Sequence, residues 1–290
     1  MAIANFLSKA SSQDNTVFRD WGSKLSAAIQ AVGFVKTSDS GQINWATVNI
    51  VAEQMAGYEI FRFNDALQAT HPIFIKLEYG NADSIYAGFR TTVGKATDGA
   101  GNLSGILHQA ASCPNGDQDS TTNFTSYVSS GDGSMLVFSL WPQFSTSYSY
   151  FHKFVIERSR DVNGNATGDG TFCYRHTAGG AADGSRSEAT DYVTGQTNIV
   201  NRGSIYTGYE IGASTSLNNG NDTPLFKSEV VTPSRVKWNP LSILGYAYSD
   251  AGNLQIIDVE GTNYLTLGNL AGQYADVSLQ QYACLAIAYY

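Results

Sequence analysis

Charged residues are scarce in this chain. Only 14 % of its 290 residues are Asp, Glu, Lys or Arg, against about a quarter in an ordinary globular protein. The 17 Lys and Arg residues form no basic cluster, and the formal net charge is −8. Binding to nucleic acid needs a basic stripe that neutralises phosphates. The composition therefore argues against a nucleic-acid partner.

Cysteine pairs and long apolar runs are also missing. Cys113, Cys173 and Cys284 lie far apart and form no CxxC pair, unlike the cysteines of a secreted disulfide scaffold. No apolar run approaches the roughly 20 residues that span a bilayer. The first residues lack the charged and apolar regions of a signal peptide. We therefore expect a protein that folds in a reducing cytosol and does not insert into a membrane.

Motifs for catalysis and cofactor binding are absent as well. The sequence contains no GxSxG, no GxxxxGK[ST] and no HExxH, and its four histidines (His71, His108, His152 and His176) show no metal-ligand spacing. We expect no enzymatic activity, no catalytic residue, no cofactor and no metal. A pair of carboxylates a few ångströms apart would suffice for glycosidase chemistry, and the sequence alone does not exclude such a pair.

One segment is a weak calcium candidate. Asp161, Asn163 and Asn165 present side-chain oxygens at alternate positions, and Asp169 follows; calcium takes oxygen ligands from loops of this kind. The glycine and the bidentate Glu of an EF-hand are missing, however, and the flanks read as strands. An Asn-Gly hairpin turn is the simpler interpretation.

The residues that are abundant favour β-structure. There are 17 Tyr, 14 Phe and 29 Gly against 6 Pro, and aromatic and β-branched residues suit pleated surfaces whereas glycine suits turns. One helix is predicted near the start, at about residues 17–32, with Asn15 or Thr16 as its N-cap and Gly33 after its end. The fold class we predict is mainly β, a β-sandwich or barrel-like fold with this single amphipathic helix.

Strands are predicted where short runs of apolar residues lie between turns. These runs are 58–63, 73–79, 134–141, 151–158, 204–211, 226–231, 243–248, 254–259 and 277–290. The polar stretches 111–133 and 176–204 read as long loops. The predicted division is 1–55 as a helix and extended arm, 56–160 as a first β unit, 161–205 as a long polar loop region and 206–290 as a second β unit, which can also form a single sandwich with the first.

A weak internal repeat connects the two β units. Three short segments recur in register, at offsets of about 150 residues: 57–60 with 208–211, 72–74 with 224–226, and 99–103 with 250–254. A tandem duplication explains the register. Convergence of turns rich in Gly, Asn and Tyr explains the same matches without one.

Two groups of aromatic residues are candidates for an interface. Phe18, Trp21 and Leu25 form an apolar helix face that must dock on the first sheet or on a neighbouring subunit. Trp141, Phe144, Tyr148 and Tyr150 crowd one serine-rich stretch, where they could stack on sugars or anchor a contact. Half of the second group pointing into a core is an equally good reading.

Several segments of the first 160 residues resemble a known family. They are FRDWGSKLSAAI at 18–29, VKTSDSGQINW at 35–45, GYEIFRFND at 57–65, PIFIKLEYG at 72–80 and ERSRD at 157–161. Together they resemble a family of uncharacterised virion structural proteins of tailed bacteriophages. The resemblance implies a component of the particle and carries no catalytic residue.

The resemblance and the composition together predict a structural protein. We expect a homo-oligomer in the tail, baseplate or neck that contacts copies of itself and other virion proteins, and that folds in the host cytoplasm and is released by lysis. Two alternatives remain: a head-decoration protein, or an exposed tail module that binds glycans of the host surface. A depolymerase is the enzymatic alternative.

Overall fold

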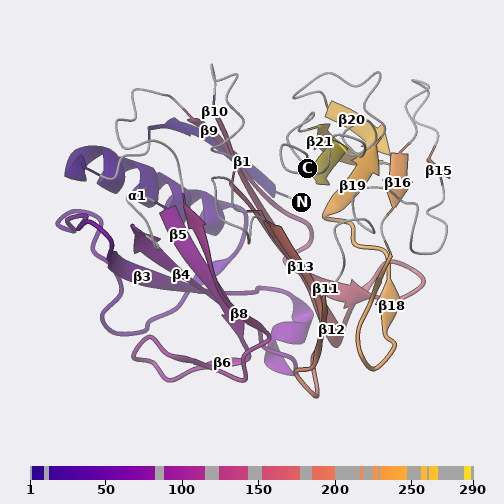
Figure 1. Ribbon diagram of the computed structural model, residues 1–290. Helices are drawn as coiled ribbons and strands as arrows, with labels where there is room; N and C mark the ends of the chain where they lie inside the picture. Colours follow the sequence, from indigo (N-terminus) through magenta and orange to yellow (C-terminus); the bar gives the residue numbers. More distant parts are fainter. Residues whose placement is uncertain are drawn as a thin grey trace.

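The computed structural model shows a mainly β protein with one long helix near the N-terminus (Figure 1), so the predicted fold class is confirmed. The structure describes residues 2–9, 13–81, 88–114, 124–142, 152–176, 185–199, 216–217, 225–227, 229–246, 256–259, 261–266 and 284–288.

Helix α1 (Asn15–Ala31) buries the apolar face that its periodicity predicts. Its N-cap is Asp14, one residue before the two predicted caps, because the Asp14 side chain accepts hydrogen bonds from the backbone N–H groups of Thr16 and Val17. The Asn15 side chain instead accepts a hydrogen bond from the Ile50 backbone at 2.8 Å. Gly33 follows the helix with φ +101°, a left-handed conformation that favours glycine, as predicted.

Two antiparallel sheets form the main body of the protein. The five-stranded sheet has the order β2 (Val35–Lys36), β3 (Met55–Arg62), β4 (Phe74–Gly80), β5 (Gly88–Gly94) and β8 (His108–Pro114). The seven-stranded sheet has the order β1 (Ala2–Ser8), β9 (Phe124–Ser130), β10 (Met135–Pro142), β11 (His152–Arg160), β12 (Ala166–His176), β13 (Ser185–Asp191) and β14 (Thr197–Ile199). A short helix, η1 (Ala66–Ala69), joins β3 to β4, and the hairpin β6 (Ala96–Thr97) and β7 (Leu103–Ser104) follows β5.

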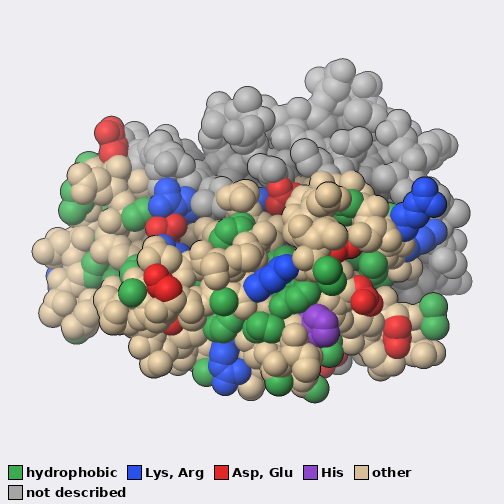
Figure 2. Space-filling view, turned by 90° about the horizontal axis from the view of Figure 1, so that it is seen from below, with side chains coloured by type: hydrophobic (Ala, Val, Ile, Leu, Met, Phe, Trp, Pro, Cys, Tyr) green, Lys and Arg blue, Asp and Glu red, His purple; other side chains and the backbone are tan. Residues whose placement is uncertain are grey.

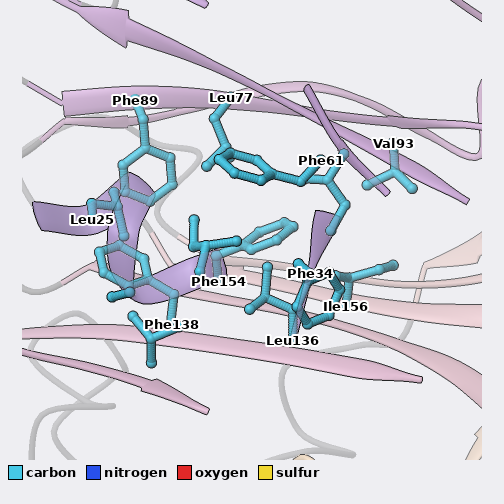
Figure 3. Close-up of a cluster of buried hydrophobic side chains, with 14 of the residues drawn as sticks. Leu25, Phe34, Phe61, Leu77, Phe89, Val93, Leu136, Phe138, Phe154 and Ile156 are labelled. Carbon is cyan, nitrogen blue, oxygen red and sulfur yellow. The ribbon is translucent and has the colours of Figure 1, made fainter. Parts of the chain in front are cut away.

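The first core lies between these two sheets, and α1 closes one side of it (Figures 1 and 3). Side chains alternate in direction along a strand, so one face of each sheet supplies the core. Phe61 and Leu77 point from one sheet toward Phe138 and Phe154 on the other (Figure 3). The whole arrangement is a sandwich with a helix packed into its open side.

The opposite face of the seven-stranded sheet is also buried. Val155 lies between two inward-pointing residues of β11 and is 0 % exposed, because the C-terminal part of the chain covers this face (Figure 1). The Ser129 hydroxyl donates to the Ala288 carbonyl at 2.8 Å, and Trp238 lies over Gly170. The seven-stranded sheet is thus the middle of three layers.

The C-terminal part has its own strands. They are a hairpin of β17 (Val230–Val231) and β18 (Lys237–Trp238), and a six-stranded sheet in the order β15 (Ser216–Leu217), β16 (Leu225–Lys227), β19 (Ile243–Tyr246), β22 (Cys284–Ala288), β21 (Thr262–Thr266) and β20 (Ile256–Val259). None of these described strands pairs with the two sheets of the main body. Both the second copy of the GYEI repeat, at 208–211, and the strand predicted at 204–211 lie outside the described residues.

The prediction of a long loop at 161–205 is wrong, because this region contains β12, β13 and β14. The loop predicted at 111–133 likewise contains β9. These strands carry polar residues that pair with one another inside the protein, as Arg175 does with Glu188 at 2.8 Å, so their sequences lack an apolar pattern. The strands predicted at 58–63, 73–79, 134–141 and 151–158 are confirmed as β3, β4, β10 and β11.

Candidate functional site

Four polar clusters and one groove hold the candidate functional residues. The first cluster lies at the end of β11, in the ERSRD segment. Glu157 is fully buried on the face of the seven-stranded sheet that the C-terminal part covers. Its carboxylate accepts hydrogen bonds from the backbone N–H groups of Leu241 at 3.0 Å and Ser242 at 2.9 Å. Arg160 donates to the same carboxylate at 2.6 Å. Charge-assisted hydrogen bonds of this kind are strong, and they attach the C-terminal part to the middle sheet.

Arg158, the next residue of β11, points to the opposite face. Its guanidinium donates to both carboxylate oxygens of Asp65, at 2.5 and 3.1 Å, and it lies 5.1 Å from the centre of the Phe63 ring. The two-pronged contact fixes both the distance and the angle between the partners. Adjacent residues of one strand therefore bind two different layers.

The second cluster surrounds Glu59 on β3. This buried carboxylate accepts hydrogen bonds from Ser26 of α1 at 2.8 Å, from Lys36 of β2 at 2.5 Å and from Tyr79 of β4 at 2.9 Å. Burial raises the pKa of Tyr79 well above its ordinary value, and the negative charge of Glu59 raises it further. Glu59 therefore fixes the helix to three strands of the five-stranded sheet.

The third cluster is a hydroxyl, an imidazole and a carboxylate in contact, the arrangement of a catalytic triad. Nε2 of His108 lies 2.9 Å from the Thr171 hydroxyl, and Nδ1 lies 3.1 Å from Glu188; hydrolases use such a relay when the nucleophile is accessible. Thr171 is 0 % exposed and His108 is 1 % exposed. No substrate reaches a fully buried hydroxyl. The three side chains therefore connect β8 of the five-stranded sheet to β12 and β13 of the seven-stranded sheet.

No signal in the sequence predicts this contact. His108 lies 63 positions from Thr171 and 80 from Glu188, and no local motif connects residues so far apart. Only the packing of the two sheets against each other brings them together.

The fourth cluster is the turn proposed as a calcium candidate. Asp161 accepts hydrogen bonds from the backbone of Asn163 at 2.8 Å and of Asn165 at 2.9 Å, and from the Asn165 side chain at 3.1 Å. The pKa of Asp161 is lowered, mainly by the hydrogen bonds from Asn165. The segment forms the β11–β12 hairpin turn, with Asp169 beyond it in β12. In the part of the chain that the structure describes, no three His, Cys, Asp or Glu residues gather at a metal-binding distance.

An open groove of about 610 Å³ lies on the outer face of the five-stranded sheet. Its lining comes from β2 and the residues after it, from β3 and β4, and from the β6–β7 hairpin: Val35, Lys36, Thr37, Ser38, Asp39, Arg62, Phe74, Thr97, Asp98 and Gly99. Asp39 accepts a hydrogen bond from the Thr97 hydroxyl. Burial raises the pKa of Asp39, but hydrogen bonds, among them those from Thr97 and the Gly101 N–H, outweigh burial and leave the pKa lowered. The carboxylate is therefore charged at neutral pH.

The proposed interface residues divide into two groups. Phe18, Trp21 and Leu25 are at most 1 % exposed, so their assignment as interface residues is corrected: they pack in the first core, because the two sheets cover the apolar face of the helix. The backbone of Trp141 is in β10, but its side chain is not described. Phe144, Tyr148 and Tyr150 lie outside the described residues.

No protein-family model, no curated protein and no solved structure matches this chain. Within the described residues, no helix is both long and apolar enough to cross a membrane.

Proposed function

We propose that this chain is a non-enzymatic structural component of a tailed-phage virion. Its place would be the tail, the baseplate or the neck, where it assembles with copies of itself and with other virion proteins. The sequence resemblance to virion structural proteins is the single observation that carries this proposal.

The positions of the resembling segments support it. Trp21, Glu59 and Tyr79 lie in three of those segments and meet in or around the first core. Glu157 and Arg158 lie in a fourth segment and bind the outer layers to the middle sheet. The resembling segments thus contain residues that hold the fold together, so the resemblance concerns the framework of the protein.

The surface also suits contact with neighbours. On the face shown in Figure 2, single positive and negative side chains are scattered among hydrophobic and other side chains, so this face shows no large block of one charge that would have to be desolvated on assembly. Val162 and Val193 are 102 % and 79 % exposed at two hairpin turns. Asp161 and Asp191 hold these turns through hydrogen bonds to the backbone. Apolar side chains on fixed turns lose little entropy when a partner covers them.

Two alternatives belong to the same proposal. One is a head-decoration protein, which has the same assembly chemistry at another place in the particle. The other is an exposed tail module that binds glycans of the host surface, and the groove beside Phe74 favours this second alternative because it is open and lined with hydroxyl and carboxylate groups.

Electron cryo-microscopy of purified particles, with mass spectrometry of their proteins, tests the proposal. We expect density for the three-layered fold in the tail, baseplate or neck, packed against neighbouring subunits. Density on the head shell would support decoration, and density at an exposed tip would support host binding. Absence of the chain from purified particles would refute the proposal. A recombinant protein that stays monomeric at high concentration would count against self-assembly.

A further inference from the structure

The floor of the groove on the five-stranded sheet consists of three residues from neighbouring strands. Val35, Arg62 and Phe74 are direct cross-strand neighbours on β2, β3 and β4. Arg62 and Phe74 are half-buried, and they alternate with the fully buried Phe61 and Ile75, so their side chains point away from the core. A phenyl ring and a guanidinium on neighbouring strands are both groups on which another ring can stack.

The wall of the groove is held in place by the backbone. Gly94 on β5 is the next cross-strand neighbour of Phe74, and a Cβ atom there would come within 3.0 Å of the Ser104 carbonyl. Its lack of a side chain lets the β6–β7 hairpin cross the sheet at this point. The Ser40 N–H donates to the Gly99 carbonyl at 2.8 Å, which joins the hairpin to the segment after β2. The groove is therefore formed before any ligand arrives.

The groove carries charges of both signs. Arg62 is positive, whereas Asp39 and Asp98 are negative. Lys36 also lines the groove, but its ammonium group is bound to the buried Glu59 at 2.5 Å on the core side of the sheet. The two carboxylates repel phosphate and other anions, and the Arg62 guanidinium repels a positive ligand. A neutral ligand with many hydroxyl groups has neither problem, since carboxylates accept from hydroxyls and guanidinium groups donate to them.

We propose that this groove binds a short neutral oligosaccharide. The apolar face of a sugar ring stacks on Phe74, and its hydroxyl groups bridge Arg62 and the wall around Asp39 and Ser38. The volume of about 610 Å³ lies within the range of about 300–1,000 Å³ that is usual for small-ligand sites. This inference deepens the glycan-binding alternative of the proposed function, and it does not depend on where in a particle the protein sits.

Binding of the purified full-length protein to an array of neutral hexose and N-acetylhexosamine oligosaccharides, with acidic oligosaccharides beside them, tests the inference. Affinities for the bound sugars are then measured by titration calorimetry. Phe74→Ala and Arg62→Gln should weaken binding at least tenfold. Lys76→Gln is the matched control, because Lys76 is a cation on the outer face of the same sheet (cross-strand from Ile60 and outside the groove), and it should leave the affinity unchanged.

Three results would overturn the inference. Failure to bind any neutral sugar rejects the ligand class, and so does binding of acidic sugars alone. Binding that survives both groove variants rejects the location. Thermal melting of all three variants shows whether they are folded, and a substitution of Ser38→Ala, at an exposed wall residue, replaces any groove variant that is not. None of these results bears on whether the chain is present in a particle, so failure here and failure of the virion proposal are distinguishable.

Discussion

The indole of Trp45 lies directly against Gly22 in α1, so closely that a Cβ atom on Gly22 would fall 2.0 Å from the ring. Trp45 also packs edge-on against Tyr79, with 4.8 Å between ring centres. A glycine in the middle of a helix lowers helix stability by about 1 kcal/mol relative to alanine. Here it lets the helix approach an aromatic cluster that connects it to the five-stranded sheet.

Gly22→Ala should therefore destabilise the protein, although alanine is the better helix former. Overpacking of a core costs about 1–3 kcal/mol, which exceeds the gain in helix propensity. Chemical denaturation measures the change in the free energy of unfolding. Ser23→Ala, at the next position of the same helix, is the control and should change stability by less than about 0.5 kcal/mol. A Gly22→Ala protein more stable than the wild type would show that Trp45 moves aside without cost.

Glu59→Gln should weaken the attachment of α1 to the sheet. The substitution keeps the shape of the side chain but removes the charge that Ser26, Lys36 and Tyr79 share. Hydrogen bonds to charged groups contribute about 1.5–3 kcal/mol each, so we expect a loss of about 2–4 kcal/mol in the free energy of unfolding.

The matched control for Glu59→Gln is Asp20→Asn, another neutral isostere. Asp20 pairs with Lys24 at 2.7 Å on the exposed side of α1, where both side chains are at least 41 % exposed, and such surface pairs contribute little. Equal melting temperatures for the two variants would contradict the role given to Glu59.

Glu157→Gln should loosen the C-terminal part without unfolding the sandwich. A glutamine has one acceptor oxygen in place of the two that Leu241 and Ser242 share with Arg160. Hydrogen exchange followed by mass spectrometry should show uptake at least about tenfold faster around residues 241–242, equivalent to about 1.4 kcal/mol, with no change in α1. Glu78→Gln, on β4 of the five-stranded sheet, should leave hydrogen exchange at residues 241–242 unchanged. Faster exchange throughout the Glu157→Gln protein would instead mean a global loss of stability.

The helix and the early strands were predictable because their apolar residues recur locally. Phe18, Trp21 and Leu25 are three and four residues apart, and this spacing predicts a buried helix face without any knowledge of what covers it. The strands β12 and β13 could not be found in the same way. Arg175 and Glu188 read as solvent-exposed when each is seen alone, and only their mutual pairing at 2.8 Å makes burial of both possible.

The groove could not be predicted from the sequence for a related reason. Val35, Arg62 and Phe74 become neighbours through strand register, and register depends on the complete sheet. The wall residues Asp39 and Thr97 are 58 positions apart. A pattern in one short segment therefore predicts an element, whereas a site assembled from four segments needs the fold.

Acid should destabilise the protein in part through Glu78 on β4. Burial raises the pKa of this carboxyl, but the hydrogen bond from Arg90 and the charges of Lys76 and Arg90 outweigh burial and leave it below the ordinary 4.5. A carboxyl whose pKa is lowered by folding contributes stability that is fully present above the ordinary value, and that is lost as the pH falls through the lower folded value. Urea denaturation between about pH 6 and pH 3 should show this loss begin below about pH 5. Arg90→Gln removes the two-pronged partner at 2.9 and 3.0 Å, so its stability should fall less steeply over the same range. Parallel curves for the two proteins would assign the acid sensitivity to other carboxyl groups.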